Sequence, residues 1–197
     1  MSEVSCSPYL WVSQGARHRL SRRAHARWKG FIIAFRCYVE QVRSLSSGVA
    51  AMRYTSARMG RVFVARVDHG EDLIGEMRTI LVKEGVSHAV MLFLGALGEG
   101  SLVTGPEEPV IPPVPHMVKF GGGWEVVGVA TAYPGEDGPA IHLHGSIGRG
   151  DRALTGCLRG RAETYLVAEV VILELADVPI QRNRDEKTGL VLPDFDA

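Results

Sequence analysis

The spacing of apolar residues predicts a strand followed by a helix at the start of the patterned part of the chain. In residues 61–67, RVFVARV, successive side chains alternate between two faces, which is strand spacing. In residues 68–85 the spacing becomes helical, with Asp68 expected as the N-cap in a capping box with Glu71, and Gly85 as the residue that ends the helix. Five apolar residues form its buried stripe: Leu73, Ile74, Met77, Ile80 and Leu81.

Short apolar runs rich in β-forming residues predict the remaining strands. They span residues 87–95, 99–104, 124–134, 140–148, 153–158 and 164–175. Residues 106–118 contain five of the ten prolines and are expected to form a loop or an edge segment. Because strands and helices do not alternate, the fold class expected is α+β, with a largely antiparallel sheet of six to seven strands and one main helix after the first strand.

Charge divides the 197-residue chain into two parts. Residues 1–55 carry nine Lys and Arg against two Asp and Glu, a net charge of +7, whereas residues 56–197 carry thirteen against twenty, a net charge of −7. We interpret residues 1–55 as a basic extension, either disordered or the product of a mis-assigned start, and residues 56–197 as one domain with a C-terminal tail at 178–197. Phosphate binding needs clustered basic residues, so contact with DNA would require the extension or a local patch.

Cysteine usage and hydropathy predict a cytoplasmic location. The three cysteines, Cys6, Cys37 and Cys157, form no Cys-x-x-Cys pair, which argues against a disulfide framework and favours a reducing compartment. No apolar run approaches the roughly 20 residues of a membrane span. The longest run near the start, residues 31–39, resembles a signal peptide but is interrupted by Arg36.

The segment AIHLHGSIGRGDRALTGCLRG, residues 140–160, carries the strongest candidate for chemistry. His142 and His144 point to the same side of a strand, and Cys157 lies on the return strand of the same predicted hairpin. Two imidazoles and a thiolate would give a metal ion three ligands and an open fourth position, and this ligand set favours Zn²⁺. Spacing alone is equally compatible with two solvated histidines beside a small buried cysteine.

Glu169 is a second, weaker candidate. It lies in the middle of the apolar run YLVAEVVIL, and a buried carboxylate is costly unless it is paired or close to a metal. It is a candidate general acid/base or a group that orients a ligating histidine. The alternative is an exposed position on one face of the sheet.

The ordered part of the chain resembles the plant and prokaryote conserved (PPC) domain family. The matching stretches run in the family's order over about residues 60–195, and the most specific are GEDL at 70–73 and the HLHGS to GCL hairpin at 142–158. The resemblance implies a homotrimer with a metal site made by His-x-His and a third histidine. Cys157 stands where that third histidine is usual, so the site either keeps a softer ligand or has been lost.

Three functions remain open at this point. The resemblance implies a trimeric metal-binding protein with a DNA-binding or regulatory role, although the RGR at 159–161 lacks the proline that follows in an AT-hook. The family's fold is also similar to that of acetolactate decarboxylase, which implies a zinc-dependent lyase or hydrolase acting on a small carbonyl or ester ligand. The third interpretation is a structural oligomer that binds no metal.

Overall fold

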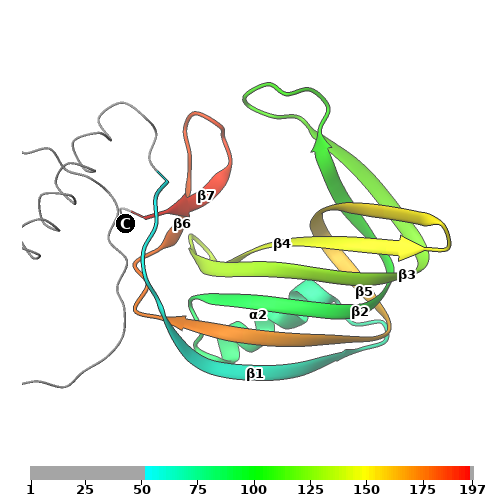
Figure 1. The fold of residues 1–197 in the computed structure, drawn as a ribbon, viewed down its shortest axis with the longest axis horizontal. Helices are drawn as coiled ribbons and strands as arrows, with labels where there is room; N and C mark the ends of the chain where they lie inside the picture. Colours follow the sequence, from blue (N-terminus) through cyan, green and yellow to red (C-terminus); the bar gives the residue numbers. More distant parts are fainter. Residues whose placement is uncertain (1–51, 196–197) are drawn as a thin grey trace, which may run out of the picture. The chain divides into compact units, whose positions relative to one another are not determined.

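The structure is a computed structural model that describes residues 52–195. The expectations for residues 1–51, and for Cys6 and Cys37 with them, lie outside the described residues. From Arg53 onward the chain belongs to one compact unit. Its elements, in chain order, are β1 (Arg58–Asp68), α2 (Leu73–Glu84), β2 (Ala89–Pro106), β3 (Pro115–Gly135), β4 (Gly138–Arg149), β5 (Arg152–Ala176), β6 (Gln181–Arg184) and β7 (Val191–Asp194) (Figure 1).

Five strands form one antiparallel sheet in the order β1-β5-β2-β3-β4. The long strand β5 also pairs with β4, so its first half lies between β2 and β4 and its second half between β1 and β2. Strands β6 and β7 form a separate two-stranded sheet from the C-terminal tail. The α+β class, the antiparallel pairing and the single main helix after the first strand are confirmed, and the seven strands are divided between two sheets.

Two pairs of predicted strands are each one continuous strand. The runs at 87–95 and 99–104 both belong to β2, and the runs at 153–158 and 164–175 both belong to β5. The glycine-rich stretch between the β2 runs is a series of bulges, with register shifts between Gly95 and Ser101. A Cβ atom at Gly95, whose φ is 141°, would lie 2.3 Å from the carbonyl oxygen of Val167, so glycine here permits close approach of β2 and β5.

Helix α2 begins four residues later than the sequence predicted. Its N-cap is Asp72, whose carboxylate accepts hydrogen bonds from the backbone N–H groups of Ile74 at 3.3 Å and Ala162 at 3.0 Å. Asp68 and Glu71, the expected capping box, lie in the turn before the helix, where the Glu71 carboxylate accepts a hydrogen bond from the backbone N–H of Asp68 at 2.8 Å. Asp72 prevails as the cap because it also joins the helix to β5. Gly85 ends the helix with a φ of 65°, as expected.

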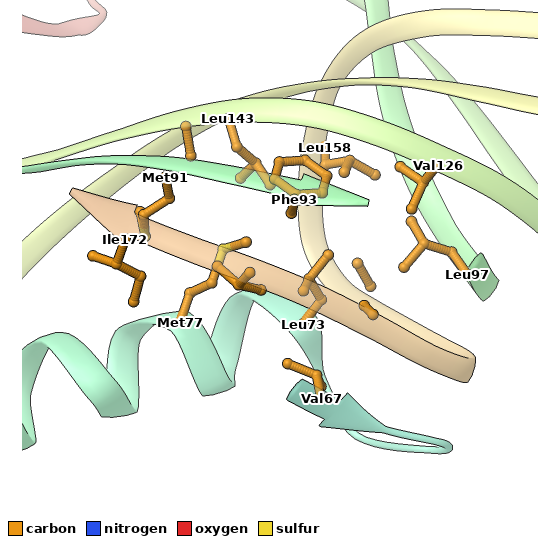
Figure 2. Packing of buried hydrophobic residues seen from close by; sticks show 14 of the residues in the cluster. Val67, Leu73, Met77, Met91, Phe93, Leu97, Val126, Leu143, Leu158 and Ile172 are labelled. Carbon is orange, nitrogen blue, oxygen red and sulfur yellow. The ribbon is translucent and has the colours of Figure 1, made fainter. Parts of the chain in front are cut away.

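The hydrophobic core lies between α2 and one face of the five-stranded sheet. Figure 2 shows Leu73 and Met77 of α2 directed toward side chains of β2, β4 and β5. Because side chains alternate along a strand, the opposite face carries a second set of residues, and among the described residues no helix covers it. We call this second side the open face. It exposes six large apolar side chains, Val62, Val64, Leu92, Leu94, Val127 and Val129.

The tail folds back onto the sheet at β3. The Arg182 side chain donates to the Thr131 hydroxyl at 3.0 Å, and the His88 ring nitrogen Nε2 lies 2.7 Å from the carbonyl oxygen of Ile180. These contacts hold the β6–β7 hairpin beside strands β3 and β4. In the described part of the chain, no helix is long and apolar enough to cross a bilayer.

The ion pair between Arg61 and Glu174 fixes the beginning of β1 to the end of β5. Two Arg61 side-chain nitrogens donate to the carboxylate at 2.8 Å each, and the Arg61 backbone N–H donates at 2.9 Å. The side-chain and backbone hydrogen bonds lower the pKa of Glu174 to about 2 from an ordinary value of 4.5. A carboxyl whose pKa is lower in the folded state stabilises the fold above its ordinary pKa, and this contribution is lost as the pH falls toward 2.

We therefore predict that Glu174→Gln lowers the free energy of unfolding at pH 7, and that the gap to the wild type narrows steadily between pH 4.5 and pH 2. Urea unfolding at a series of pH values measures both. Glu125→Gln, at an exposed position of β3, is the control and is expected to follow the wild type at every pH. A gap for Glu174→Gln that stays constant down to pH 2 would contradict the prediction.

Candidate metal centre

The hairpin of β4 and β5 places His144 and Cys157 directly opposite each other. The strands pair in register from His144 with Cys157 to Arg149 with Arg152, and Gly150 in the turn has a φ of 61°. Directly opposed residues of an antiparallel pair point to the same side of the sheet. His142 precedes His144 by two positions and shares that side. The hairpin predicted from the sequence therefore brings the three candidate ligands together.

The three side chains converge on one point. One nitrogen of each imidazole and the Cys157 sulfur all lie within 4.8 Å of one another. The two rings are 5.0 Å apart between centroids and nearly perpendicular, at 87°. Cys157 is buried, His142 is half-buried and His144 is exposed, so the group runs from the protein interior to the surface.

Close packing beneath the ligands depends on Gly156, which precedes Cys157 on β5. A Cβ atom at this position would lie 2.2 Å from the Val103 carbonyl oxygen on β2. Any larger residue would push β5 away from β2. Glycine at 156 therefore sets how deeply the neighbouring thiol lies in the sheet.

Burial sets the protonation of the ligands. It raises the pKa of the Cys157 thiol, and this effect is partly offset by the positive charge of Arg159. Burial also lowers the pKa of His142, and the charge of Arg182 lowers it further. At neutral pH the His142 ring is thus held neutral with a free lone pair, whereas the thiol must release a proton to become a ligand.

The donor set and its spacing fit a tetrahedral ion. Zinc bonds of about 2.0–2.3 Å place neighbouring ligand atoms roughly 3.3–3.8 Å apart. Side-chain rotations that move the ligand atoms by about 1 Å would bring the observed group, whose atoms lie within 4.8 Å, to this spacing. Three protein ligands leave the fourth position to a bound molecule. Two imidazoles and a thiolate match Zn²⁺ and other ions that prefer nitrogen and sulfur, and they do not match Mg²⁺ or Ca²⁺.

A mostly apolar pocket of about 660 Å³ opens beside the three ligands. Its walls include Val103 of β2, Met117 of β3 and Leu190 of the tail hairpin. The prolines at 106, 113 and 115, from the proline-rich segment, form another side. The fourth position of a bound ion would therefore face a cavity large enough for a small organic molecule.

Glu169 does not join this group. It is exposed on β5, opposite Arg66 of β1 and Leu94 of β2. It lies in the second half of β5, between β1 and β2, whereas Cys157 lies in the first half, where β5 pairs with β4. Of the two interpretations of Glu169, the structure has the exposed one, because the face of β5 that carries this residue is the open face and is not covered by α2.

Two arginines near the ligands were not singled out from the sequence. Arg159 follows Cys157 by two positions, so it lies on the same side of β5, and Arg182 comes from the tail hairpin. The separation of two residues was a local signal that could have identified Arg159. Nothing local indicates Arg182, since only the fold of the tail brings it beside His142.

Comparison with known proteins identifies a family and several solved structures with a similar fold. A family model described as the Plants and Prokaryotes Conserved (PCC) domain matches residues 54–176. A metal-containing protein from Archaeoglobus fulgidus has a similar structure, with a TM-score of 0.64 and 24% identity over 72% of this chain and 98% of that chain. No curated protein matches the sequence significantly.

Two further solved structures share the fold. A plant- and prokaryote-conserved (PPC) protein from Pyrococcus horikoshii gives a TM-score of 0.62 at 24% identity, over 73% of this chain and 97% of that chain. A protein from Bacteroides thetaiotaomicron, named a "putative DNA-binding protein", gives 0.61 at 19% identity, over 72% of this chain and 99% of that chain. At these identities the likeness concerns the fold.

Proposed function

This chain belongs to the Plants and Prokaryotes Conserved domain family, and from that premise we propose that it is a zinc-binding protein with His142, His144 and Cys157 as ligands. The convergence of these three ligand atoms within 4.8 Å is the observation that carries the proposal. The name of the Archaeoglobus relative, a metal-containing protein, supports it. A free thiol ligand is typical of a reducing compartment, which is consistent with the proposed cytoplasmic location.

The pocket beside the ligands favours a role that involves a small molecule. A zinc ion held here would supply Lewis-acid polarisation of an oxygen atom of the bound molecule. His142 and His144 would orient the ion toward the pocket, and the apolar walls of Val103 and Met117 would exclude water from it. On this basis we propose a zinc-dependent lyase or hydrolase acting on a small carbonyl or ester compound as the candidate activity.

We propose that the protein is a homotrimer that associates through the open face. Val64 is 80% exposed there, and five other large apolar side chains lie on the same face, on strands β1, β2 and β3. Continuous apolar surface of this kind is unusual on a monomer and typical of an interface. A second copy of the same chain is the partner that the family resemblance implies. His144 pairs with Val129, so the metal centre lies at the edge of the same face.

DNA binding is the second candidate function. The basic segment 1–55 and the name of the Bacteroides relative favour it. The remaining residues have a net charge of −7, which opposes binding of phosphates by the folded part as a whole. DNA contact is therefore proposed for the extension, with the domain in a regulatory role.

We predict one zinc ion per chain in purified wild-type protein. His142→Ala and Cys157→Ala are each expected to weaken zinc binding by at least about a hundredfold, because a lost ligand costs more than a lost orienting group. Elemental analysis and competition with a chromogenic chelator measure the change. His116→Ala is the control, since that exposed histidine pairs with Glu107 at 2.8 Å and is expected to leave zinc binding intact.

Cys157→His tests the same site by replacing one ligand with another instead of removing it. It restores the three-histidine set that the family resemblance implies and is expected to keep zinc. Equal zinc content in the wild type, His142→Ala and Cys157→Ala would refute the metal site.

We predict that the wild type sediments as a trimer and that Val64→Lys sediments as a monomer. Lysine at this exposed position leaves the monomer fold intact but introduces a charge that the interface would have to bury. Val82→Lys, on the outer side of α2 where Val82 is 63% exposed, is the matched control and is expected to remain trimeric. A monomeric wild type, or a trimeric Val64→Lys, would exclude this interface.

We predict that full-length protein binds duplex DNA with an affinity that falls steeply with salt, and that protein lacking residues 1–55 does not bind even at low salt. A gel-shift titration at several salt concentrations measures both. Strong binding by the shortened protein would move the contact to the folded domain, and absence of binding by the full chain would remove DNA from its functions.

A further inference from the structure

Three arginines line a second pocket on the other side of His142. The pocket measures about 500 Å³, and its walls include Arg78 of α2, Arg159 of β5 and Arg182 of β6. The β6–β7 hairpin covers one side of it with residues 189–193. No aspartate or glutamate is among its lining residues. Three cations thus line one pocket in a domain whose net charge is negative, although Arg78 and Arg182 also line a neighbouring pocket with Glu136 and Asp137.

Arg182 is the least expected of the three, because it is only 8% exposed. Its guanidinium donates to the Thr131 hydroxyl at 3.0 Å and to the Val191 carbonyl at 3.3 Å, and it lies 5.5 Å from the centre of the Tyr133 ring. Its Nε atom is buried without a hydrogen-bond partner. Among the described residues no carboxylate forms an ion pair with it.

A buried guanidinium without an anion is costly, because neutral oxygens compensate only part of the lost hydration. Arg159 and Arg78 are exposed and likewise form no ion pair among the described residues. Their positive charges therefore add to that of Arg182 instead of being neutralised. Such an arrangement is stabilised when an anion from outside the chain enters the pocket.

The arginine-lined pocket and the apolar pocket adjoin at the metal centre. They share His142, Arg159 and Leu190. A molecule that spans both would place a charged end among the arginines and an uncharged body against Val103 and Met117. The junction at His142 would place the atoms between these two parts beside the candidate metal ligands.

We propose that this protein binds a small organic oxyanion, whose charged group is held by Arg159 and Arg182 with Arg78 at the rim and whose short apolar body lies in the adjoining pocket. A carboxylate and a phosphate monoester both present oxygens that a guanidinium fork accepts. Binding of the oxyanion does not require a metal ion. Its placement beside a zinc ion rests on the proposed function.

The experiment uses the full-length protein, stripped with a chelator and, in parallel, loaded with zinc. The probes are hexanoate, its uncharged analogue hexanamide, and hexyl phosphate, with binding measured by calorimetry and by the shift in Tm. Hexanoate or hexyl phosphate is expected to bind both protein forms, and hexanamide to bind at least about tenfold more weakly. The stronger of the two anions identifies the chemical source of the oxyanion.

Substitutions locate the site. Arg159→Gln changes an exposed residue and is expected to weaken anion binding at least about tenfold, because one charge-assisted contact is lost. Arg152→Gln, an exposed arginine at the turn of the same hairpin, is the matched control and is expected to bind like the wild type. Arg182→Lys keeps the buried charge if Arg182→Gln does not fold, and is expected to weaken binding because the planar fork is lost.

Equal affinity for hexanamide and hexanoate, or full anion binding by Arg159→Gln, would overturn the proposal. If neither anion binds but duplex DNA binds tightly through these arginines, the proposal is overturned as well. If the stripped protein binds an anion but cannot be loaded with zinc, the metal site is refuted and the oxyanion site stands. If the protein binds zinc but no anion, the oxyanion site is refuted and the metal site stands.

Discussion

The pairing of β5 with three different strands is the constraint on which the structure depends. One continuous strand of 25 residues exchanges backbone hydrogen bonds with β1 and β2 in its second half and with β2 and β4 in its first half. Its registers must all be satisfied at once, because a shift of one residue would turn every side chain to the other face. The bulges of β2, together with Gly95 of β2 and Gly156 of β5, where the two strands approach closely, make these registers compatible. Cys157 faces His144 because of this arrangement.

The same alternation of side chains that builds the core also builds the face that carries the candidate ligands His142 and His144. Residues directed toward α2 are buried by the helix, and their neighbours along each strand form the open face. The histidines lie at the edge of that face on β4, the last strand in the order, which pairs with β3 and, from His144 onward, with β5. The apolar surface lies beside the three candidate ligands, so a partner copy bound to the open face, as proposed, would also change the solvent access of a bound ion.

The tail gives the site its electrostatic character. Strands β6 and β7 contribute little to the core, but they carry Arg182 beside His142 and close one side of the neighbouring pocket. Burial lowers the pKa of His142 and the positive charge of Arg182 lowers it further, so both favour the neutral ring. The positive charge also favours an anionic ligand. A pocket with candidate metal ligands on one side, arginines on the other and an apolar wall is suited to an organic acid more than to the regular phosphate backbone of a duplex.

The sequence by itself determined the features that depend on local periodicity. Alternation of apolar residues identified the strands, helical spacing identified α2, and the His-x-His pattern required both imidazoles to share one side of β4. These motifs also carried the resemblance to the family, which the match over residues 54–176 confirms. The hairpin between them was short enough for its register to follow from turn geometry, so the convergence of Cys157 with the histidines was predictable.

Only the tertiary structure decided the features that depend on contacts between distant residues. Asp72 caps α2 in place of Asp68 because β5 offers it a second hydrogen bond, from the backbone N–H of Ala162. The apparent breaks in β2 and β5 are bulges, because glycine allows close strand approach as readily as it allows a turn. Glu169 is exposed because its strand alternates between a covered and an uncovered face. Arg182 lies beside His142 only because the tail returns to the sheet, and no local pattern encodes such a return.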